Sequence, residues 1–510
     1  MEPNIHLMSW WQKLLYRIGQ WFSDLPDNTG TFFHNLGVGF VNFFKRLGSG
    51  VASYCSGFVK GDLITKCSYL IMGLGHLCRK QAVKGLLYLA LEVLFVLYMV
   101  AFGGPYLGKF FYGFFDGGTV GYVETQDFWN EDAGVYEKIA GDNSFKIILY
   151  GVLTFCVIIF FLMLYFRSVK ESRELEQMIR EGRTPLGFRN DLRALTDSKF
   201  QLTLLILPMI GLFMFTVIPL LTMILIAFTN YDASTEVPQH LFRWVGFANF
   251  GSVLGGNASM SATFLRVLGW TLVWAFFATF TNYFGGMILA LLINQKVVKA
   301  KKLFRTMFVA TIAVPQFVSL LIMSKMLTYG DSMEMSGIIV QLFHNLFGSD
   351  IKFGVDINTT RLWIIIVNMW VGVPYSMLIC SGILMNIPAE LYESSRIDGA
   401  GPVRTFISIT LPYMFFVTGP YLITQFIGNI NNFNVIYLLS GGAPGDLLKY
   451  TDGAKGTDLL ITWLYKLSLG VDRNYKLDSV IGILVFVISA VFSLLVYNKS
   501  SAVQKEDEFQ

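Results

Sequence analysis

The sequence predicts an all-α, polytopic membrane protein with about eight membrane-spanning helices. Hydrophobic residues make up 54% of the 510 residues and charged residues only 15%, whereas an ordinary soluble domain carries about a quarter charged residues. The mean hydropathy of +0.54 agrees with this class. The third observation is a series of apolar runs, each long enough to cross a bilayer. The net charge of +4 is too small to indicate nucleic acid as a partner.

Eight apolar runs reach the roughly 20 residues that a span requires. They are Val83–Gly103, Phe145–Phe166, Leu202–Thr229, Phe264–Ile293, Phe304–Leu327, Leu362–Met385, Met414–Leu439 and Ser479–Tyr497. The fourth run contains Asn282 beside two adjacent glycines, which predicts a tilt or a kink. The seventh contains several asparagines and is the weakest candidate.

The Lys and Arg residues of the loops predict the orientation. They are concentrated before the first run, between the second and third, and between the fourth and fifth (Arg79, Lys80, Lys84; Arg167, Lys170, Arg173, Arg180, Arg183, Arg189, Arg193, Lys199; Lys296, Lys299, Lys301, Lys302). The intervening loop Gly104–Ser144 is mainly acidic, which is typical of a solvated outer surface. Basic residues between the seventh and eighth runs go against this trend, but charge in a long loop directs insertion weakly. We therefore expect both termini in the cytoplasm.

The expected domain organisation follows from these runs. Residues 1–80 contain no span, but apolar residues of Trp10–Phe22 and Phe33–Leu47 recur at helical spacing between basic ones. This pattern predicts helices lying in the headgroup plane or, alternatively, packed on protein. Residues 81–200 hold two accessory spans with the outer loop and a basic linker, residues 201–498 hold the transmembrane core, and residues 499–510 form a cytoplasmic tail.

No catalytic or metal site is expected. The spans contain no carboxylate pair and no cluster of metal ligands, which argues against a membrane-embedded enzyme. The five cysteines show no CxxC or metal-ligand spacing, so we expect them to pack as small residues. The chain also lacks a G-x-x-x-x-G-K-[ST] phosphate loop and is not expected to bind nucleotide in that way.

The segment Ile387–Tyr413, between the sixth and seventh runs, is too polar for hydrocarbon and predicts two short helices. Pro388 suits the first turn of a helix that continues to Asp398. The glycines that follow end this helix, and Pro402 can begin a second one that leads into the seventh span. The pair would project from the cytoplasmic side as a small knob that contacts another protein.

This knob resembles the EAA signature of ABC importer permeases, over residues 387–412. The signature spacing is met by Glu393, Ser394, Ser395, Gly399, Ile409, Leu411 and Pro412, and Asp398 and Ala400 are similar to the sugar-importer branch. Serines replace the two alanines of the signature and are also small. The resemblance implies a type I ABC importer permease core in the plasma membrane of a bacterial cell. It also implies that the knob binds an ATPase subunit.

Further stretches between Leu202 and Tyr497 resemble the permeases of maltose and maltodextrin importers. They are VGFANF (Val245–Phe250), ALLINQK (Ala290–Lys296), KKLFRTMF (Lys301–Phe308), NMWVGVPY (Asn368–Tyr375), GNINNFNVIYLLSGGAP (Gly428–Pro444) and YTDGAKGTDLLITWLYKLSL (Tyr450–Leu469). The resemblance implies a transport subunit rather than an enzyme, and an oligosaccharide substrate of the maltose or maltodextrin type. It does not name the sugar.

The same resemblance implies the partners. They are a second permease subunit, two ATPase subunits that hold ATP–Mg, an extracytoplasmic sugar-binding protein and the bilayer, with no nucleic acid. The enteric form of the family carries a large periplasmic domain where this chain has the short loop Tyr231–Thr263. This difference implies a cell without a periplasm and a lipid-tethered binding protein.

Amide and aromatic side chains within the spans are the candidates for sugar contact. An amide in hydrocarbon needs a partner or a cavity, and a sugar offers both hydroxyl groups and apolar faces. In the maltose-type family, the positions of N-x-x-x-G-x-x-Y and N-x-x-N line the sugar site. The resemblance therefore implies substrate contacts for Asn368, Gly372, Tyr375, Asn429 and Asn432, with Gln425 and Gln316 as further candidates. The alternative is hydrogen bonding between helices.

An ion-coupled secondary sugar transporter is the main alternative function. Such a carrier needs carboxylates within the membrane, and the predicted spans offer essentially one, Glu92. A single carboxylate makes a poor relay, so we expect Glu92 to be paired or to face water.

Overall fold

The structure is a computed structural model that describes residues 37–497 apart from short gaps. The gaps are residues 40, 43–44, 46–48, 51, 53, 132–133, 185–186, 188–189, 191–192, 194–195, 199, 237–240, 296 and 471–472. The amphipathic segment expected at Trp10–Phe22, most of Phe33–Leu47 and the expected tail 499–510 lie outside the described residues. The chain divides into two compact units, Met1–Pro105 with Leu153–Leu212, and Tyr106–Val152 with Phe213–Gln510.

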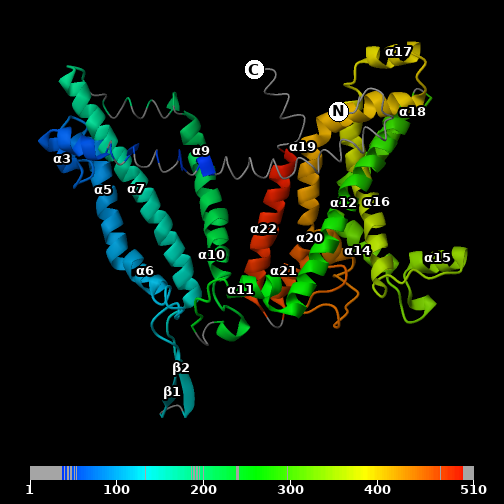
Figure 1. Ribbon diagram of the computed structural model, residues 1–510, viewed down its shortest axis with the longest axis horizontal. Coiled ribbons are helices and arrows are strands. Elements are labelled where there is room, and N and C mark those ends of the chain that lie inside the picture. Colours follow the sequence, from blue (N-terminus) through cyan, green and yellow to red (C-terminus); the bar gives the residue numbers. More distant parts are fainter. Residues whose placement is uncertain are drawn as a thin grey trace, which may run out of the picture. The chain divides into compact units, whose positions relative to one another are not determined.

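Seven helical segments of the described chain are long and apolar enough to cross a membrane (Figure 1). They are Ala82–Phe111 (α5 Ala82–Tyr98, η2 Met99–Gly103, α6 Gly104–Phe111), α7 (Ser144–Arg180), Thr203–Ile226 (within α9 Phe200–Leu212, η3 Phe213–Val217, α10 Ile218–Ile226), α12 (Ala258–Asn294), α16 (Ile357–Leu384), Pro402–Ile430 (α18 Pro402–Thr405, η7 Phe406–Thr410, α19 Leu411–Ile430) and Tyr475–Leu494 of α22 (Tyr475–Tyr497). Each coincides with one of the predicted runs. The class of a polytopic, almost wholly helical membrane protein is therefore confirmed.

In the first unit, a buried arginine joins the short helices α3 (Leu63–Ser68) and α4 (Leu74–Leu77) to α7. The Arg79 guanidinium donates hydrogen bonds to the Ser172 carbonyl, to Asp62 Oδ1 and to Thr65 Oγ1, each at 2.7 Å. Burial acts to raise the pKa of Asp62, but hydrogen bonds from Thr65 and Arg79 outweigh it and lower that pKa below its ordinary value. This network holds the short helices against α7.

Glu92 is paired with the backbone of the same unit. Its Oε2 atom accepts a hydrogen bond of 2.8 Å from the Met72 N–H group, just before α4. The carboxylate of the first span thus satisfies a backbone donor, as expected for a paired group.

The five cysteines are all free, but they are not all packed. Cys380 is buried, whereas Cys55, Cys67 and Cys78 are exposed. The expectation that the cysteines fill small packing positions is therefore wrong for these three. Sequence spacing alone carries no information on which way a lone cysteine faces.

In the second unit, the loop between the first two spans contains a two-stranded antiparallel hairpin that the sequence analysis does not predict. β1 (Gln126–Asn130) pairs with β2 (Val135–Ile139). Asp142 follows the hairpin and contacts Lys109 Nζ at 2.5 Å, and it accepts hydrogen bonds from the N–H groups of Tyr122 and Val123. Burial acts to raise the pKa of Asp142, but these partners outweigh it and lower the pKa.

The long helix α12 is the centre of the second unit. It contributes buried residues to three hydrophobic clusters. One joins it to α16 and α19, and a second joins it to α19, α21 (Leu460–Leu469) and α22. The third joins it to α14 (Gln316–Leu327), α16 and α20 (Phe433–Leu439). Tyr283 and Met287 of α12, for example, pack with Met377 of α16 and Met414 of α19. Side chains of neighbouring helices therefore meet along α12.

The adjacent glycines Gly285 and Gly286 of α12 allow a close contact between helices. α12 runs unbroken over 37 residues, through both of these glycines. A Cβ atom on Gly286 would lie 2.6 Å from the Met377 backbone nitrogen, and one on Gly285 would lie 2.8 Å from Val373 Cγ2. Both neighbours belong to α16. The glycines are needed because the backbones of the two helices approach closely.

Two predicted spans are interrupted in the structure. The fifth run was expected as one helix, but α13 (Lys301–Ala313) and α14 are bent by 86° relative to each other, at Val314–Pro315. Proline has no N–H to continue the helical ladder and clashes with the preceding turn. The seventh run ends as a helix at Ile430, and α20 begins after Asn432.

The remaining short elements connect these helices. They are η4 (Ala233–Thr235), α11 (Ala248–Gly251), η5 (Ser252–Gly256), η6 (Met333–Met335), α15 (Ile338–Phe347) and α17 (Ala389–Ile397).

Candidate functional site

The predicted knob is present as α17, a tight bend and α18. In Figure 1, α17 stands apart from the spanning helices. α17 ends at Ile397, and α18 begins at Pro402, its first helical residue. The short interrupted helix pair expected from the sequence therefore forms within 387–412.

Gly399 makes the bend possible. Its φ angle is +71°, a left-handed conformation that other residues adopt only with strain. The Ala400 N–H group donates to the Ser395 carbonyl at 2.9 Å, and the Gly399 N–H group donates to the Arg396 carbonyl at 3.1 Å. These two bonds form a Schellman motif, which satisfies the last carbonyls of α17.

Ser395 joins the two halves of the knob. It is buried, and its hydroxyl group donates to the Tyr392 carbonyl at 2.9 Å and lies 3.3 Å from Thr405 Oγ1 of α18. The Tyr392 hydroxyl lies 3.1 Å from Thr410 Oγ1. Small size at position 395 is therefore required by contact within the knob, which accounts for a serine where the signature has an alanine.

The outer surface of the knob mixes apolar and charged side chains. Ile397 is 86% exposed and Val403 is 72% exposed, and Leu391 is also exposed. Glu393, Ser394, Asp398 and Gly399 are exposed beside them, and Ala400 is half-buried. Such a mixed patch is typical of a surface that binds another protein.

The knob continues into the seventh span without a break. The helical segment Pro402–Ile430 comprises α18, η7 and α19. Ile409 and Leu411 are half-buried along it, and Pro412 is exposed within the first turn of α19. A displacement of the knob would therefore be carried along one helical segment.

On α16, the three candidate sugar residues differ in exposure. Asn368 is buried, and its Nδ2 atom has no hydrogen-bond partner among the described residues. Gly372 lies against Asn282 of α12, because a Cβ atom on Gly372 would be 2.2 Å from Asn282 Nδ2. Tyr375 is half exposed. Gly372 thus provides the space that the Asn282 amide occupies.

At the end of α19, the two candidate asparagines contact each other. Asn432 Nδ2 donates to Asn429 Oδ1 at 3.2 Å, and Asn429 Nδ2 donates to Thr279 Oγ1 of α12 at 3.0 Å. Asn432 Oδ1 accepts from the Val435 N–H group at 3.3 Å and so caps α20. These bonds fix the amides where the helix breaks.

Both groups of candidates meet the same turn of α12. Thr279 bonds to Asn429, and Asn282, three residues further on, lies against Gly372. Like the Asn368 donor, the buried Oδ1 atom of Asn282 has no hydrogen-bond partner within the described ranges. Asn282 is the residue that the sequence analysis missed as a site candidate, although an amide within an apolar run was the available signal.

The two glutamines lie in different surroundings. Gln425 is half-buried on α19, one turn before Asn429. Gln316 is exposed at the first residue of α14, just after the bend at Pro315.

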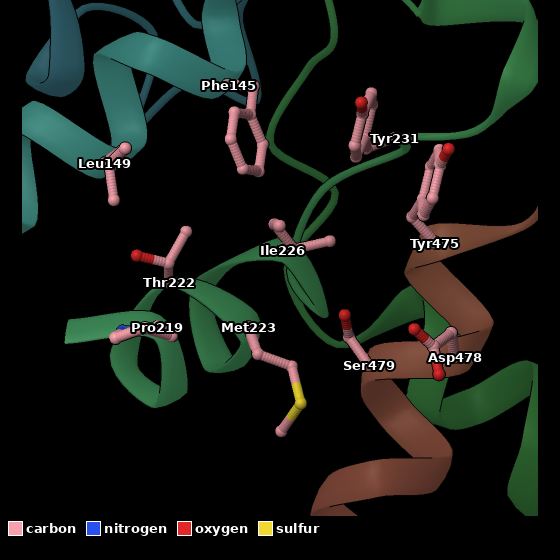
Figure 2. Close-up of a pocket in the computed structure, with 10 residues that line it drawn as sticks. All are labelled: Phe145, Leu149, Pro219, Thr222, Met223, Ile226, Tyr231, Tyr475, Asp478 and Ser479. Carbon is pink, nitrogen blue, oxygen red and sulfur yellow. The ribbon is translucent and has the colours of Figure 1, made fainter. Parts of the chain in front are cut away.

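A separate cavity of about 440 Å³ in the second unit contains none of the seven candidates (Figure 2). It is lined by Phe145, Leu149, Pro219, Thr222, Met223, Ile226, Tyr231, Tyr475, Asp478 and Ser479. The Tyr231 and Tyr475 rings stack at 4.6 Å, and burial raises the pKa of Tyr231 to about 12. Within the described part of the chain, no three His, Cys, Asp or Glu side chains converge to hold a metal ion.

Comparison with known proteins identifies the family. A family model described as "Binding-protein-dependent transport system inner membrane component" matches residues 282–503. The maltodextrin transport system permease protein MalC of Streptococcus pneumoniae is 30% identical over 444 residues, which cover 86% of this chain and 96% of MalC. The chain belongs to this permease family. The permease MdxF of the Bacillus subtilis maltodextrin transport system is 33% identical over 445 residues, covering 86% of this chain and 95% of MdxF.

A third relative of the permease is GanP, from the galactooligosaccharides transport system of Bacillus subtilis. It is 34% identical over 424 residues, covering 82% of this chain and 94% of GanP. The expected membership of the ABC importer permeases is thus confirmed, and a secondary transporter is not favoured. All of the candidate knob and sugar residues lie within the matched residues 282–503.

Proposed function

We propose that this chain is the permease subunit of an ATP-driven importer that carries an oligosaccharide of the maltodextrin type. The observation that carries the proposal is the similarity to two maltodextrin permeases over nearly their whole length. The amide groups along α12, α16 and α19 support it, because a sugar hydroxyl both donates and accepts hydrogen bonds.

The knob is proposed as the point where an ATPase subunit binds. Exposed Ile397 and Val403 beside charged residues offer a protein-binding surface, and the Schellman motif holds that surface in one conformation. ATP–Mg would be held by two ATPase subunits on the cytoplasmic side. Both termini would lie on that side too, in the plasma membrane of a bacterial cell.

The sugar is proposed to bind at the other end of the segment that carries the knob. Asn429 is the penultimate residue of α19, and Pro402–Ile430 is about 40 Å long at 1.5 Å per residue. ATP-driven movement of the knob would therefore shift the Asn429–Asn432 pair relative to α12. Asn368, Gly372 and Tyr375 of α16 would also contact the sugar, with Gln425 and Gln316 as further contacts.

A galactooligosaccharide is the second candidate substrate, because GanP is as similar to this chain as the maltodextrin permeases are. The two sugar classes differ in the orientation of their hydroxyl groups, and the amides would distinguish them through hydrogen bonds to those groups. The extracytoplasmic binding protein, proposed to be tethered to lipid, would select the sugar first, before the second permease subunit and this chain receive it.

Uptake into proteoliposomes tests the proposal. The complete importer with its binding protein is reconstituted, and accumulation of labelled maltotetraose and of a galactotriose is measured with and without ATP inside. We expect ATP-dependent uptake of maltotetraose. ATP-dependent uptake of galactotriose but not of maltotetraose would show that the substrate is a galactooligosaccharide rather than a maltodextrin. Uptake driven by an ion gradient without ATP would overturn the importer proposal.

A further inference from the structure

Two adjacent leucines between α20 and α21 are almost completely exposed. Leu447 is 95% exposed and Leu448 is 98% exposed. Single exposed leucines are normal in folded proteins. An adjacent pair at the tip of an ordered turn, however, presents a compact apolar surface that nothing in the described chain covers.

The turn that carries the leucines is held at both ends. Asp446 Oδ1 accepts a hydrogen bond from the Leu448 N–H group at 3.1 Å, and the Asp446 carbonyl accepts from the Tyr450 N–H group at 2.9 Å. Tyr450 is buried, and Arg266 of α12 donates to the Lys449 carbonyl at 2.5 Å. The leucines therefore stand at the middle of a fixed turn.

The base of this segment is also rigid. The Asp458 carboxylate is buried and pairs with Lys466 of α21 at 2.6 Å. A Cβ atom on Gly442 would lie 2.3 Å from Asp458 Oδ1, so the chain passes directly over the ion pair. Arg361 of α16 donates to the Gly456 carbonyl at 2.7 Å. A pre-organised surface loses little conformational entropy when it binds a partner.

A polar hollow of about 480 Å³ adjoins the leucine turn. It is lined by Val355, Asp356, Ile357, Asn358, Pro444, Gly445, Asp446 and Lys449. Asp446 and Lys449 also form an ion pair of 3.0 Å within the turn that carries the leucines. Insertion of the leucines into lipid would bring these charges to the hydrocarbon boundary, which is unfavourable. A protein with both an apolar depression and polar side chains fits this surface better.

The leucine turn and the knob lie at opposite ends of α19. The knob precedes α19, and the turn follows α20 after the helix break (Figure 1). If the knob meets the ATPase in the cytoplasm, the turn faces the outside of the cell. This inference rests on the proposed function.

We propose that Leu447 and Leu448 are a docking point for the extracytoplasmic sugar-binding protein. The family is described as binding-protein-dependent, so such a protein must deliver its sugar at the outer face. The leucines enter an apolar depression on the binding protein, and the hollow beside them receives its polar side chains. Their rigid base keeps the docked protein in a constant position above the amides of α12, α16 and α19.

The test uses the complete importer in nanodiscs and its sugar-loaded, fluorescently labelled binding protein. We expect the double variant Leu447→Asp/Leu448→Asp to weaken binding at least about tenfold, as the loss of a central apolar contact does. Subunit composition and ATPase activity without binding protein should stay as in the wild type. The matched control is Leu469→Asp, which alters an exposed leucine at the end of α21 and should bind normally.

Four outcomes separate the explanations. Unchanged binding by the double variant overturns the docking proposal, while normal uptake by the wild type leaves the importer function intact. Loss of the second permease from the purified variant complex would show that the leucines contact that subunit, which would also overturn the docking proposal. Weaker depth-dependent quenching, by brominated lipids in the nanodisc, of a fluorophore attached to a Lys449→Cys side chain when the leucines are replaced would assign them to the membrane and overturn the docking proposal. A photo-crosslinking amino acid in place of Leu448 should give a product that contains the binding protein, which supports docking without a charge substitution.

Discussion

Asn432 serves the fold and the proposed sugar site with the same amide group. Its Oδ1 atom caps α20, and its Nδ2 atom holds Asn429. Removing the whole amide would therefore alter stability and sugar contact together. A serine at position 432 separates the effect on stability from the effect on sugar contact. Its hydroxyl oxygen can still cap α20, but its shorter side chain does not reach Asn429 or the proposed sugar.

Asn432→Ala is expected to lose both functions, with about 1 kcal/mol lower stability from the missing cap. Asn432→Ser is expected to keep nearly wild-type stability while the KM for sugar uptake rises. Thermal unfolding of the purified importer and uptake kinetics measure the two effects. A serine variant with the wild-type KM would show that Asn432 is a helix cap only.

Asn282 is expected to take part in sugar contact, because its buried Oδ1 atom and the Asn368 Nδ2 atom can bond to one hydroxyl group. Loss of one such bond is worth about 1 kcal/mol, so Asn282→Ala should raise the KM for uptake about fivefold. Asn434→Ala, an exposed asparagine of α20, is the control and should change nothing. A lower melting temperature with an unchanged KM would place Asn282 in helix packing.

The bend between α17 and α18 depends on the left-handed conformation of Gly399. There is open space around it, so the cost of a side chain is backbone strain of about 1–2 kcal/mol. We expect Gly399→Ala and Gly399→Asp to insert normally but to lower sugar uptake relative to ATP hydrolysis. Gly401→Ala is the matched control, since Gly401 has an ordinary φ of −69° and also open space. The same ratio of sugar uptake to ATP hydrolysis in all of these variants would contradict the role of the bend.

The close contact between α12 and α16 leads to a second comparison of glycines. Gly286→Ala places a methyl group 2.6 Å from the Met377 backbone and should destabilise the protein by about 1–3 kcal/mol. Gly269→Ala on the same helix meets no neighbour and should be neutral or stabilising by about 0.5–1 kcal/mol. Melting temperatures of the two variants check the prediction, and equal values would refute it.

Most spanning helices could be predicted from the sequence because length and hydropathy alone decide whether a run can cross a bilayer. The breaks could not. Pro208, Pro374 and Pro420 all lie inside continuous helices, whereas Pro315 stands at a bend of 86°. A proline in a span is tolerated or not according to its neighbours, which a single sequence does not show. The contact that Gly285 and Gly286 of α12 make with α16 could not be predicted for the same reason.

The candidate site was predictable in part. The spacing of the knob signature predicted the helix pair α17 and α18 and its continuation into α19, where Ile409, Leu411 and Pro412 lie along the spanning segment. The amides of α16 and α19 were proposed from their position within apolar runs. Asn282 was missed because its significance comes from its contact with Gly372 on another helix. The leucine pair was missed because exposure on a loop cannot be read from composition.

The division into two compact units predicts that damage to one stays local. Arg79→Met removes the hydrogen bonds to the buried Ser172 carbonyl and Thr65 hydroxyl group, and a buried polar group left without its partner costs about 1–3 kcal/mol. We expect faster hydrogen exchange of α3 and α4 backbone amides, with unchanged protection of α12 and α16. Lys170→Met is the control, because its exposed pair with Glu174 is worth less than about 1 kcal/mol. Equal loss of protection in α12 would show that the units unfold together.

The unbroken segment from Pro402 to Ile430 has a reciprocal consequence. If binding of the knob to the ATPase alters the surroundings of Asn429, then thermodynamic linkage requires that a sugar held by Asn429 alters the free energy of that binding by the same amount. A loaded permease should therefore change the affinity of the distant ATPase pair for nucleotide, even though no atom of the sugar comes near it.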